Sequence, residues 1–141
     1  KESNQTIYPE PILHISAHEN KSGLELTSGE FLPWNQLRTL LLILGKDTGY
    51  LRNGTSFWQV CFSVCKGAYA KEMFSVGPPY PCYAIIGPKE NVDWPDALTA
   101  FITFYHQSIY KQSQVEDAVR IMNLAAGLDN IFSVIKCPGV L

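Results

Sequence analysis

One stretch constrains the fold more than any other: residues 56–67, SFWQVCFSVCKG, an aromatic and β-branched run that ends on a cysteine and a Lys-Gly turn. Strand-forming residues occupy both of its faces, as a central strand covered by helices on either side requires. Cys61, Ser63 and Cys65 share one face at period two, and Phe62 takes the other. The stretch therefore predicts a buried strand in a sheet with two covered faces.

Cys65 ends this strand, and the pattern that follows in residues 68–73, AYAKEM, is typical of a short helix. Open α/β sheets place their sites at the carboxyl ends of strands. A helix N-terminus also lowers the pKa of a nearby thiol, because it favours the thiolate. Cys65 is therefore a candidate nucleophile. The alternative is a buried, inert cysteine, since free cysteine is among the most commonly buried residues.

Composition bounds the class of protein. The chain has 141 residues, enough for one domain with a single core, and 46% of them are hydrophobic, which favours a folded globule. A net charge of −2 argues against a nucleic-acid partner. No apolar run is long enough to span a bilayer, so we expect no membrane partner. The four cysteines lack metal-binding spacing, so we expect no metal, no cofactor, and reduced thiols in a cytoplasmic protein.

The order of elements predicts an α/β fold, with a mainly parallel sheet and helices on both faces. Residues 1–11 are expected to be a polar leader or linker end, and residues 12–141 the folded domain. The remaining strands are expected at residues 12–18, in a two-residue-turn hairpin over 24–27 and 30–32, and at 83–86 and 132–135.

Helix signals complete this outline. A first helix is predicted from Pro33 until Gly45 stops it, followed by a loop over residues 46–55. Asp93 begins a second helix as its N-cap. A third helix starts from a capping box made by Ser113 and Glu116 and ends at Gly127, with Val115, Val119, Met122 and Ala126 facing inward. The stripe expected to face inward on the second helix consists of Ala97, Phe101, Phe104, Tyr105, Ser108 and Ile109.

His18 ends the strand predicted at residues 12–18, as Cys65 ends its own strand. If the two strands are parallel neighbours, both tips lie at one edge of the sheet, within reach of a Cys-His dyad. His18 would be the general base that takes the thiol proton and later protonates the leaving amine. The backbone N–H groups of Glu19 and Cys65 are the candidates for the oxyanion hole.

A resemblance adds to this interpretation. ILHISAH, then VCFSVCKG, YAIIGPKENVDWPDALTAFITFYHQSIY and SQVEDAVRIMNLA follow in an order and spacing that resemble the CHAT family of caspase-like cysteine peptidases, from Pro11 to Ala126. The resemblance implies a caspase-like three-layer sandwich and a peptidase (hydrolase) with Cys65 and His18 as catalytic residues. It also implies a protein or peptide substrate and a regulatory domain or partner protein.

Glu19 departs from the family's pattern, which usually has glycine after the histidine. If that position needs a positive φ, glutamate is strained there. Its carboxylate could block a substrate or fill a pocket, which would make the chain a catalytically inactive interaction or regulatory module. A carboxylate near His18 could equally favour an imidazolium and so support a thiolate-imidazolium pair.

Asp93 has two interpretations. It is either the N-cap of the second helix or, as the resemblance to caspase-like peptidases implies, part of the wall of the primary substrate pocket, with Asp96 as the other candidate. An acidic residue there would select Arg or Lys at the cleaved position. His14 is interpreted as a core or supporting histidine, His106 as structural or solvent-facing, and Cys61 as core. A nucleotide-binding domain is a further alternative, but no Gly-rich phosphate loop follows any strand.

Overall fold

The central sheet of the protein has four strands in the order β1-β7-β8-β9. The computed structural model describes residues 10–63 and 66–139. Its elements in chain order are β1 (Ile12–Ile15), β2 (His18–Asn20), β3 (Gly23–Glu25), β4 (Phe31–Pro33), α1 (Trp34–Thr48), β5 (Leu51–Arg52), β6 (Thr55–Ser56), β7 (Gln59–Phe62), the 3₁₀ helix η1 (Gly67–Phe74), β8 (Ala84–Pro88), α2 (Trp94–Tyr105), the π-helical turn η2 (His106–Tyr110), α3 (Val115–Ala125) and β9 (Phe132–Lys136).

The sheet is mixed, and three of its strands are parallel. β7 pairs in parallel with β1 on one side and with β8 on the other, so it is the central strand that its sequence predicts. β9 pairs antiparallel with β8. The reason is the connection: two helices, α2 and α3, follow β8, and the second returns the chain to the edge at which β8 ends. The following strand must then run in the opposite direction.

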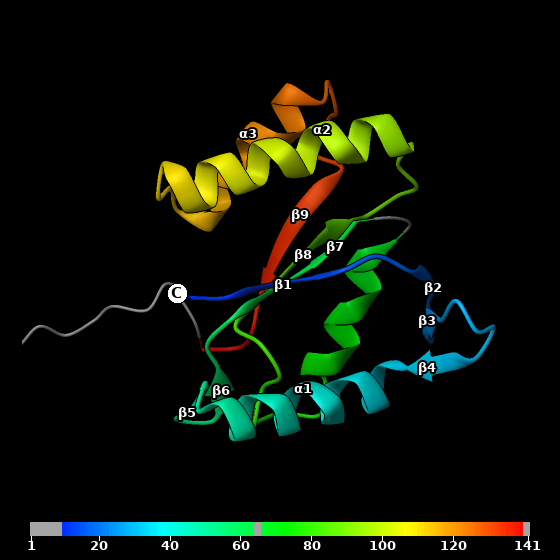
Figure 1. Cartoon of the computed structure of the whole chain (residues 1–141), viewed down its shortest axis with the longest axis vertical. Coiled ribbons are helices and arrows are strands. Elements are labelled where there is room, and N and C mark those ends of the chain that lie inside the picture. The colour runs from blue at the N-terminus through cyan, green and yellow to red at the C-terminus, as the bar shows by residue number, and fades with distance from the viewer. Residues whose placement is uncertain (1–9, 64–65, 140–141) are drawn as a thin grey trace, which may run out of the picture.

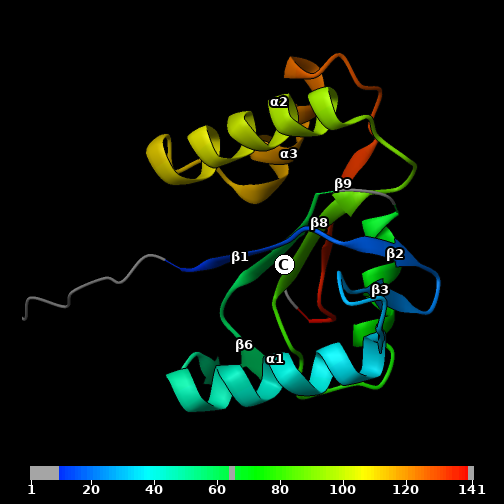
Figure 2. The ribbon, with the colours of Figure 1, turned by 45° about the vertical axis from the view of Figure 1, so that its right-hand side comes forward.

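Helices cover both faces of the sheet, as Figures 1 and 2 show, with α1 and η1 on one side and α2 and α3 on the other. Each side has its own apolar core. Val60 and Phe62 of β7 belong to the core beneath α1, whereas Cys61 between them belongs to the core beneath α2 and α3. This alternation confirms the predicted period of two for β7. The mixed α/β class is therefore confirmed.

The first helix extends further than predicted. It passes through Gly45 and ends at Thr48, and Gly49 closes it in the left-handed conformation with a φ of 78°. Gly45 is needed for close packing, because a Cβ there would lie 2.3 Å from the Oγ atom of Ser56. The prediction of a loop at residues 46–55 is also wrong. These residues form the end of α1 and most of the β5–β6 hairpin.

Three local predictions are wrong: a capping box, the inward face of one residue and the length of one connection. Ser113 forms no capping box; the N-cap of α3 is Gln114, and the Ser113 hydroxyl donates to Oε1 of Gln107 at 3.0 Å. Ile109 does not face inward and is 66% exposed, because the wider π-helical turn η2 interrupts the 3.6-residue period there. The β3–β4 connection is longer than the two residues predicted.

Other predictions are confirmed by the structure. A strand forms at Phe132–Lys136, and η1 supplies the short helical segment after β7. Val115, Val119 and Met122 are buried on the inner face of α3. Of the helices in the described part of the chain, none is long and apolar enough to cross a bilayer.

Candidate active site

The strand that leads to His18 is a direct parallel neighbour of the strand that leads to Cys65. Ile15 at the end of β1 pairs with Phe62 at the end of β7. The backbone N–H of Ser63 continues this contact by donating to the carbonyl oxygen of Ile15 at 3.3 Å. A Cys65-His18 dyad requires that the strands before the two residues are parallel neighbours. β1 and β7 meet this requirement.

His18 does not lie at the end of the β1 strand, which corrects the prediction of one strand over residues 12–18. β1 ends at Ile15, and His18 begins β2, the edge strand of a small antiparallel sheet, β2-β3-β4. Its neighbour across that sheet is Glu25 of β3. His18 is exposed, and its position depends on the hairpin next to the main sheet as well as on β1.

Cys65, with Val64, lies outside the described residues. The residues that flank this gap are described on both sides. Ser63 is buried and contacts Ile15, as given above. On the other side, Gly67 lies against the side chain of Glu19, because a Cβ added to Gly67 would lie 3.2 Å from Oε1 of Glu19. Residues on either side of Cys65 thus contact residues on either side of His18.

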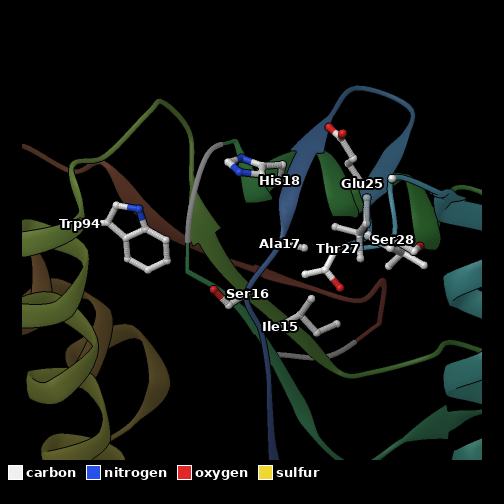
Figure 3. Close-up of a pocket in the computed structure, with 11 residues that line it drawn as sticks. Ile15, Ser16, Ala17, His18, Glu25, Thr27, Ser28 and Trp94 are labelled. Atoms are coloured by element: carbon white, nitrogen blue, oxygen red, sulfur yellow. The ribbon is translucent and has the colours of Figure 1, made fainter.

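An open pocket of about 710 Å³ lies beside His18. Residues 15–18 form one wall, residues 24–29 of β3 and the following turn form a second, and Trp94 from the start of α2 closes it. Figure 3 shows His18 between Trp94 on one side and Glu25 on the other. A cavity of this size at the C-terminal edge of a parallel sheet is where α/β proteins bind their ligands.

Glu19 is neither strained nor in the pocket. It belongs to the extended strand β2 and is absent from the residues with positive φ. Its side chain does not line the pocket but lies against Gly67. Burial raises the pKa of Glu19 to about 8, because the charged form is costly away from water. Burial therefore disfavours the charged form of Glu19 beside His18 near neutral pH.

Asp93 and Asp96 lie near the pocket without lining it. Asp93 occupies the N-cap position of α2, as predicted, although its side chain forms no capping hydrogen bond. Asp96 lies in the first turn of the same helix and is half-buried. The pocket residue from this segment is Trp94, which sequence reasoning missed. A large aromatic residue directly after a predicted N-cap was the signal that could have identified it, since that position on a helix is normally exposed.

The residues of β3 and its turn were missed as well. The sequence places residues 24–29 in a hairpin, but nothing in their pattern indicates that they line a pocket together with residues 15–18. The small sheet is tied to the start of α1, because the indole N–H of Trp34 donates to the carbonyl oxygen of Lys21 in the β2–β3 turn at 3.0 Å. Where this sheet lies relative to β1 leaves no local sequence signal.

The remaining histidines and cysteines have structural surroundings. His14 is exposed and therefore not a core residue, but it has supporting contacts: its Nδ1 is hydrogen-bonded to the Tyr105 hydroxyl. Partial burial lowers the pKa of His14. The His106 ring stacks on Tyr110 with centroids 5.3 Å apart. Cys61 is fully buried, and burial raises its pKa to about 12. It is a core residue, as predicted. Cys82 and Cys137 are also buried, and burial raises the pKa of each.

Across residues 10–63 and 66–139, no three His, Cys, Asp or Glu side chains lie close enough together to hold a metal ion. Comparison with known proteins finds no protein-family model and no curated protein that matches this chain.

Proposed function

We propose that this chain is a caspase-like cysteine peptidase domain, with Cys65 as nucleophile and His18 as general base. One observation carries the proposal: the residues flanking Cys65 contact the residues flanking His18, through the Ser63–Ile15 hydrogen bond and the Gly67–Glu19 contact. Cys65 is two residues from each of Ser63 and Gly67, and an extended chain spans at most about 3.6 Å per residue. This supports a thiol and an imidazole within reach of each other beside the pocket.

The architecture is compatible with the caspase-like fold that the resemblance implies. Two parallel strands lead toward His18 and Cys65, β8 is the next parallel strand, and an antiparallel strand completes the sheet. Helices cover both faces. The helix η1 begins at Gly67, two residues after Cys65. These features support a fold that presents a nucleophile at the tip of its central strand.

The proposed reaction is hydrolysis of a peptide bond through a thioester. His18 takes the proton of the Cys65 thiol, and the sulfur attacks the carbonyl carbon of the scissile bond. Backbone N–H groups of Glu19 and Cys65 donate to the oxyanion that forms. When the C–N bond breaks, His18 gives its proton to the leaving amine. Water, deprotonated by His18, then attacks the thioester and releases the acid and the thiol.

The decisive experiment is labelling of the full chain with a peptidyl vinyl sulfone, with the modified residue identified by mass spectrometry. We expect Cys65 to react at least a hundredfold faster than free cysteine, and Cys65→Ala to abolish both labelling and peptide cleavage. The other three cysteines serve as internal controls, because all three are buried. Peptide cleavage that survives Cys65→Ala would exclude the proposal.

The alternative, a catalytically inactive interaction module, predicts a different result in the same experiment. Cys65 would then react no faster than free cysteine, and Cys65→Ala would change nothing. Glu19 motivated this alternative, but its side chain lies against Gly67 and does not occupy the pocket. The pocket therefore stays open to a substrate.

A further inference from the structure

Trp94 is an exposed aromatic residue at the wall of the His18 pocket. Its side chain is 63% exposed, whereas the other two tryptophans, Trp34 and Trp58, are 4% and 2% exposed and belong to the core. Exposed tryptophan is unusual, because the indole has a large apolar surface, and it is enriched at binding sites. The wall it forms is a surface that a ligand can cover.

The rest of the pocket is mainly uncharged. Ile15, Ala17, Leu24 and Leu26 contribute apolar surface. Glu25 is the only carboxylate among the described residues that line the pocket. It is paired in register with His18, and Figure 3 shows it on the far side of the site from Trp94. The pocket lining therefore offers a basic side chain no carboxylate on the Trp94 side.

We propose that the His18 pocket binds an apolar, preferably aromatic, side chain of a peptide substrate next to the scissile bond, with Trp94 as its principal contact. The inference rests on the proposed peptidase function and names its substrate class. A substrate phenyl ring can stack on the indole and cover the apolar surface of residues 15–17. A volume of about 710 Å³ also leaves room for the neighbouring residue of an extended peptide.

The competing specificity is for arginine or lysine. Asp93 and Asp96 flank Trp94 in the sequence but do not line the pocket. A cation can also stack on an indole without a carboxylate, so the two specificities must be separated by changing Trp94 itself. Trp94→Leu keeps an apolar wall and removes the π system. The substitution should therefore weaken the binding of an apolar side chain much less than the binding of a stacked cation.

The binding test uses the full chain carrying Cys65→Ala, with acetylated peptide amides that differ only in one central residue, Phe or Arg. Because Trp94 is the exposed tryptophan, acrylamide quenches its fluorescence selectively. We expect the Phe peptide to lower the quenching constant at least threefold and the Arg peptide to leave it unchanged. Trp94→Phe is the control that must abolish the quenchable signal. Equal protection by both peptides, or by neither, would overturn the inference.

The cleavage test compares kcat/KM for substrates with Phe, Leu or Arg before the scissile bond. We expect Phe and Leu to exceed Arg at least tenfold, Trp94→Ala to remove this preference, and Trp94→Leu to retain most of it. A preference for Arg that is lost in Asp93→Asn or Asp96→Asn would overturn the inference while leaving the peptidase intact. If no substrate is cleaved and Cys65 is not labelled, the peptidase proposal fails, and the quenching result alone decides the ligand class.

Discussion

Two histidines four residues apart are both exposed but have different neighbours. His14 lies in β1 and packs edge-on against Phe101, with ring centroids 4.7 Å apart, while its Nδ1 is hydrogen-bonded to Tyr105. Both of these partners belong to α2. His18, in β2, lines an open pocket instead. The sequence does not distinguish the two residues, because both are histidines in the same short apolar segment. Only the packing of neighbouring elements shows which is a supporting histidine and which is a candidate base.

The difference follows from where the covering helix lies. α2 crosses the sheet beside β1 and packs Phe101 and Tyr105 against His14. Its N-terminal residue Trp94 reaches only the rim of the His18 pocket (Figure 3). A histidine that must exchange protons needs a ring accessible to substrate, whereas one that supports a helix needs partners. Substitutions at the two histidines and beside the pocket should therefore have effects of different size.

The largest expected effect is on His18. His18→Ala should lower kcat/KM by about a thousandfold, since a positioned general acid-base contributes about 10²–10⁴. The melting temperature should change little, because the side chain is exposed. Peptide hydrolysis and calorimetry on the same samples measure the two effects. His14→Ala is the matched control, and loss of activity in His14→Ala but not in His18→Ala would reverse the assignment.

The next effect concerns the backbone beside the His18 site. Gly87→Ala should destabilise the fold by about 1–3 kcal/mol through overpacking. The Cβ of the new alanine would lie 2.9 Å from the carbonyl carbon of Gly67. The start of η1 must then move, so activity should fall too. Chemical denaturation measures the free energy of unfolding. Ser133→Ala, at the position paired with Gly87, removes only the hydroxyl that donates to the Gly87 carbonyl oxygen at 3.4 Å and should cost less; equal stability of the two variants would contradict the close packing.

A smaller effect is expected at His14. His14→Ala should reduce the free energy of unfolding by about 1 kcal/mol, the range of one aromatic pair, and leave kcat/KM within twofold. Tyr105→Phe keeps the ring and removes the hydroxyl that bonds to Nδ1. It should therefore lose only part of that stability. A His14→Ala variant as stable as the parent would show that its contacts with α2 are not stabilising.

The remaining effects are pH dependences of opposite sign. The pKa of His14 is lowered on folding. The unfolded chain then binds more protons just below the usual histidine pKa, and stability falls as pH drops through that range. The pKa of Glu19 is raised from 4.5 to about 8. The folded chain keeps a proton that the unfolded chain releases, so this contribution is present at low pH and is lost as pH rises toward 8.

Melting temperatures from pH 4 to 9 separate these two contributions. Glu19→Gln should match the parent near pH 4 and melt at a higher temperature above pH 8, because an amide needs no proton there. His14→Phe should lose the decline between neutral and acidic pH. Parallel curves for the parent and Glu19→Gln would show that burial does not perturb the Glu19 pKa.

Elements with a local signal can be read from the amino-acid sequence without knowledge of the packing. Alternating apolar residues specified β7 and its two faces. The pattern after Gly67 specified a short helical segment, and Asp93 marked the start of α2. The order of these elements was enough for the mixed α/β class and for a central β7 between two other strands. The fold class can be predicted in this way because the spacing of apolar side chains in a strand or helix is set by the geometry of that segment alone.

The tertiary structure alone decided the rest, because contacts between distant segments are not encoded in local periodicity. It ended β1 at Ile15 and moved His18 into a second sheet. It carried α1 past Gly45, where Ser56 packs so closely that a Cβ would not fit. It also turned Glu19 toward Gly67 and brought Trp94, rather than Asp93 or Asp96, to the pocket. Each of these outcomes depends on which element packs beside a residue, and burial and pKa follow from that packing.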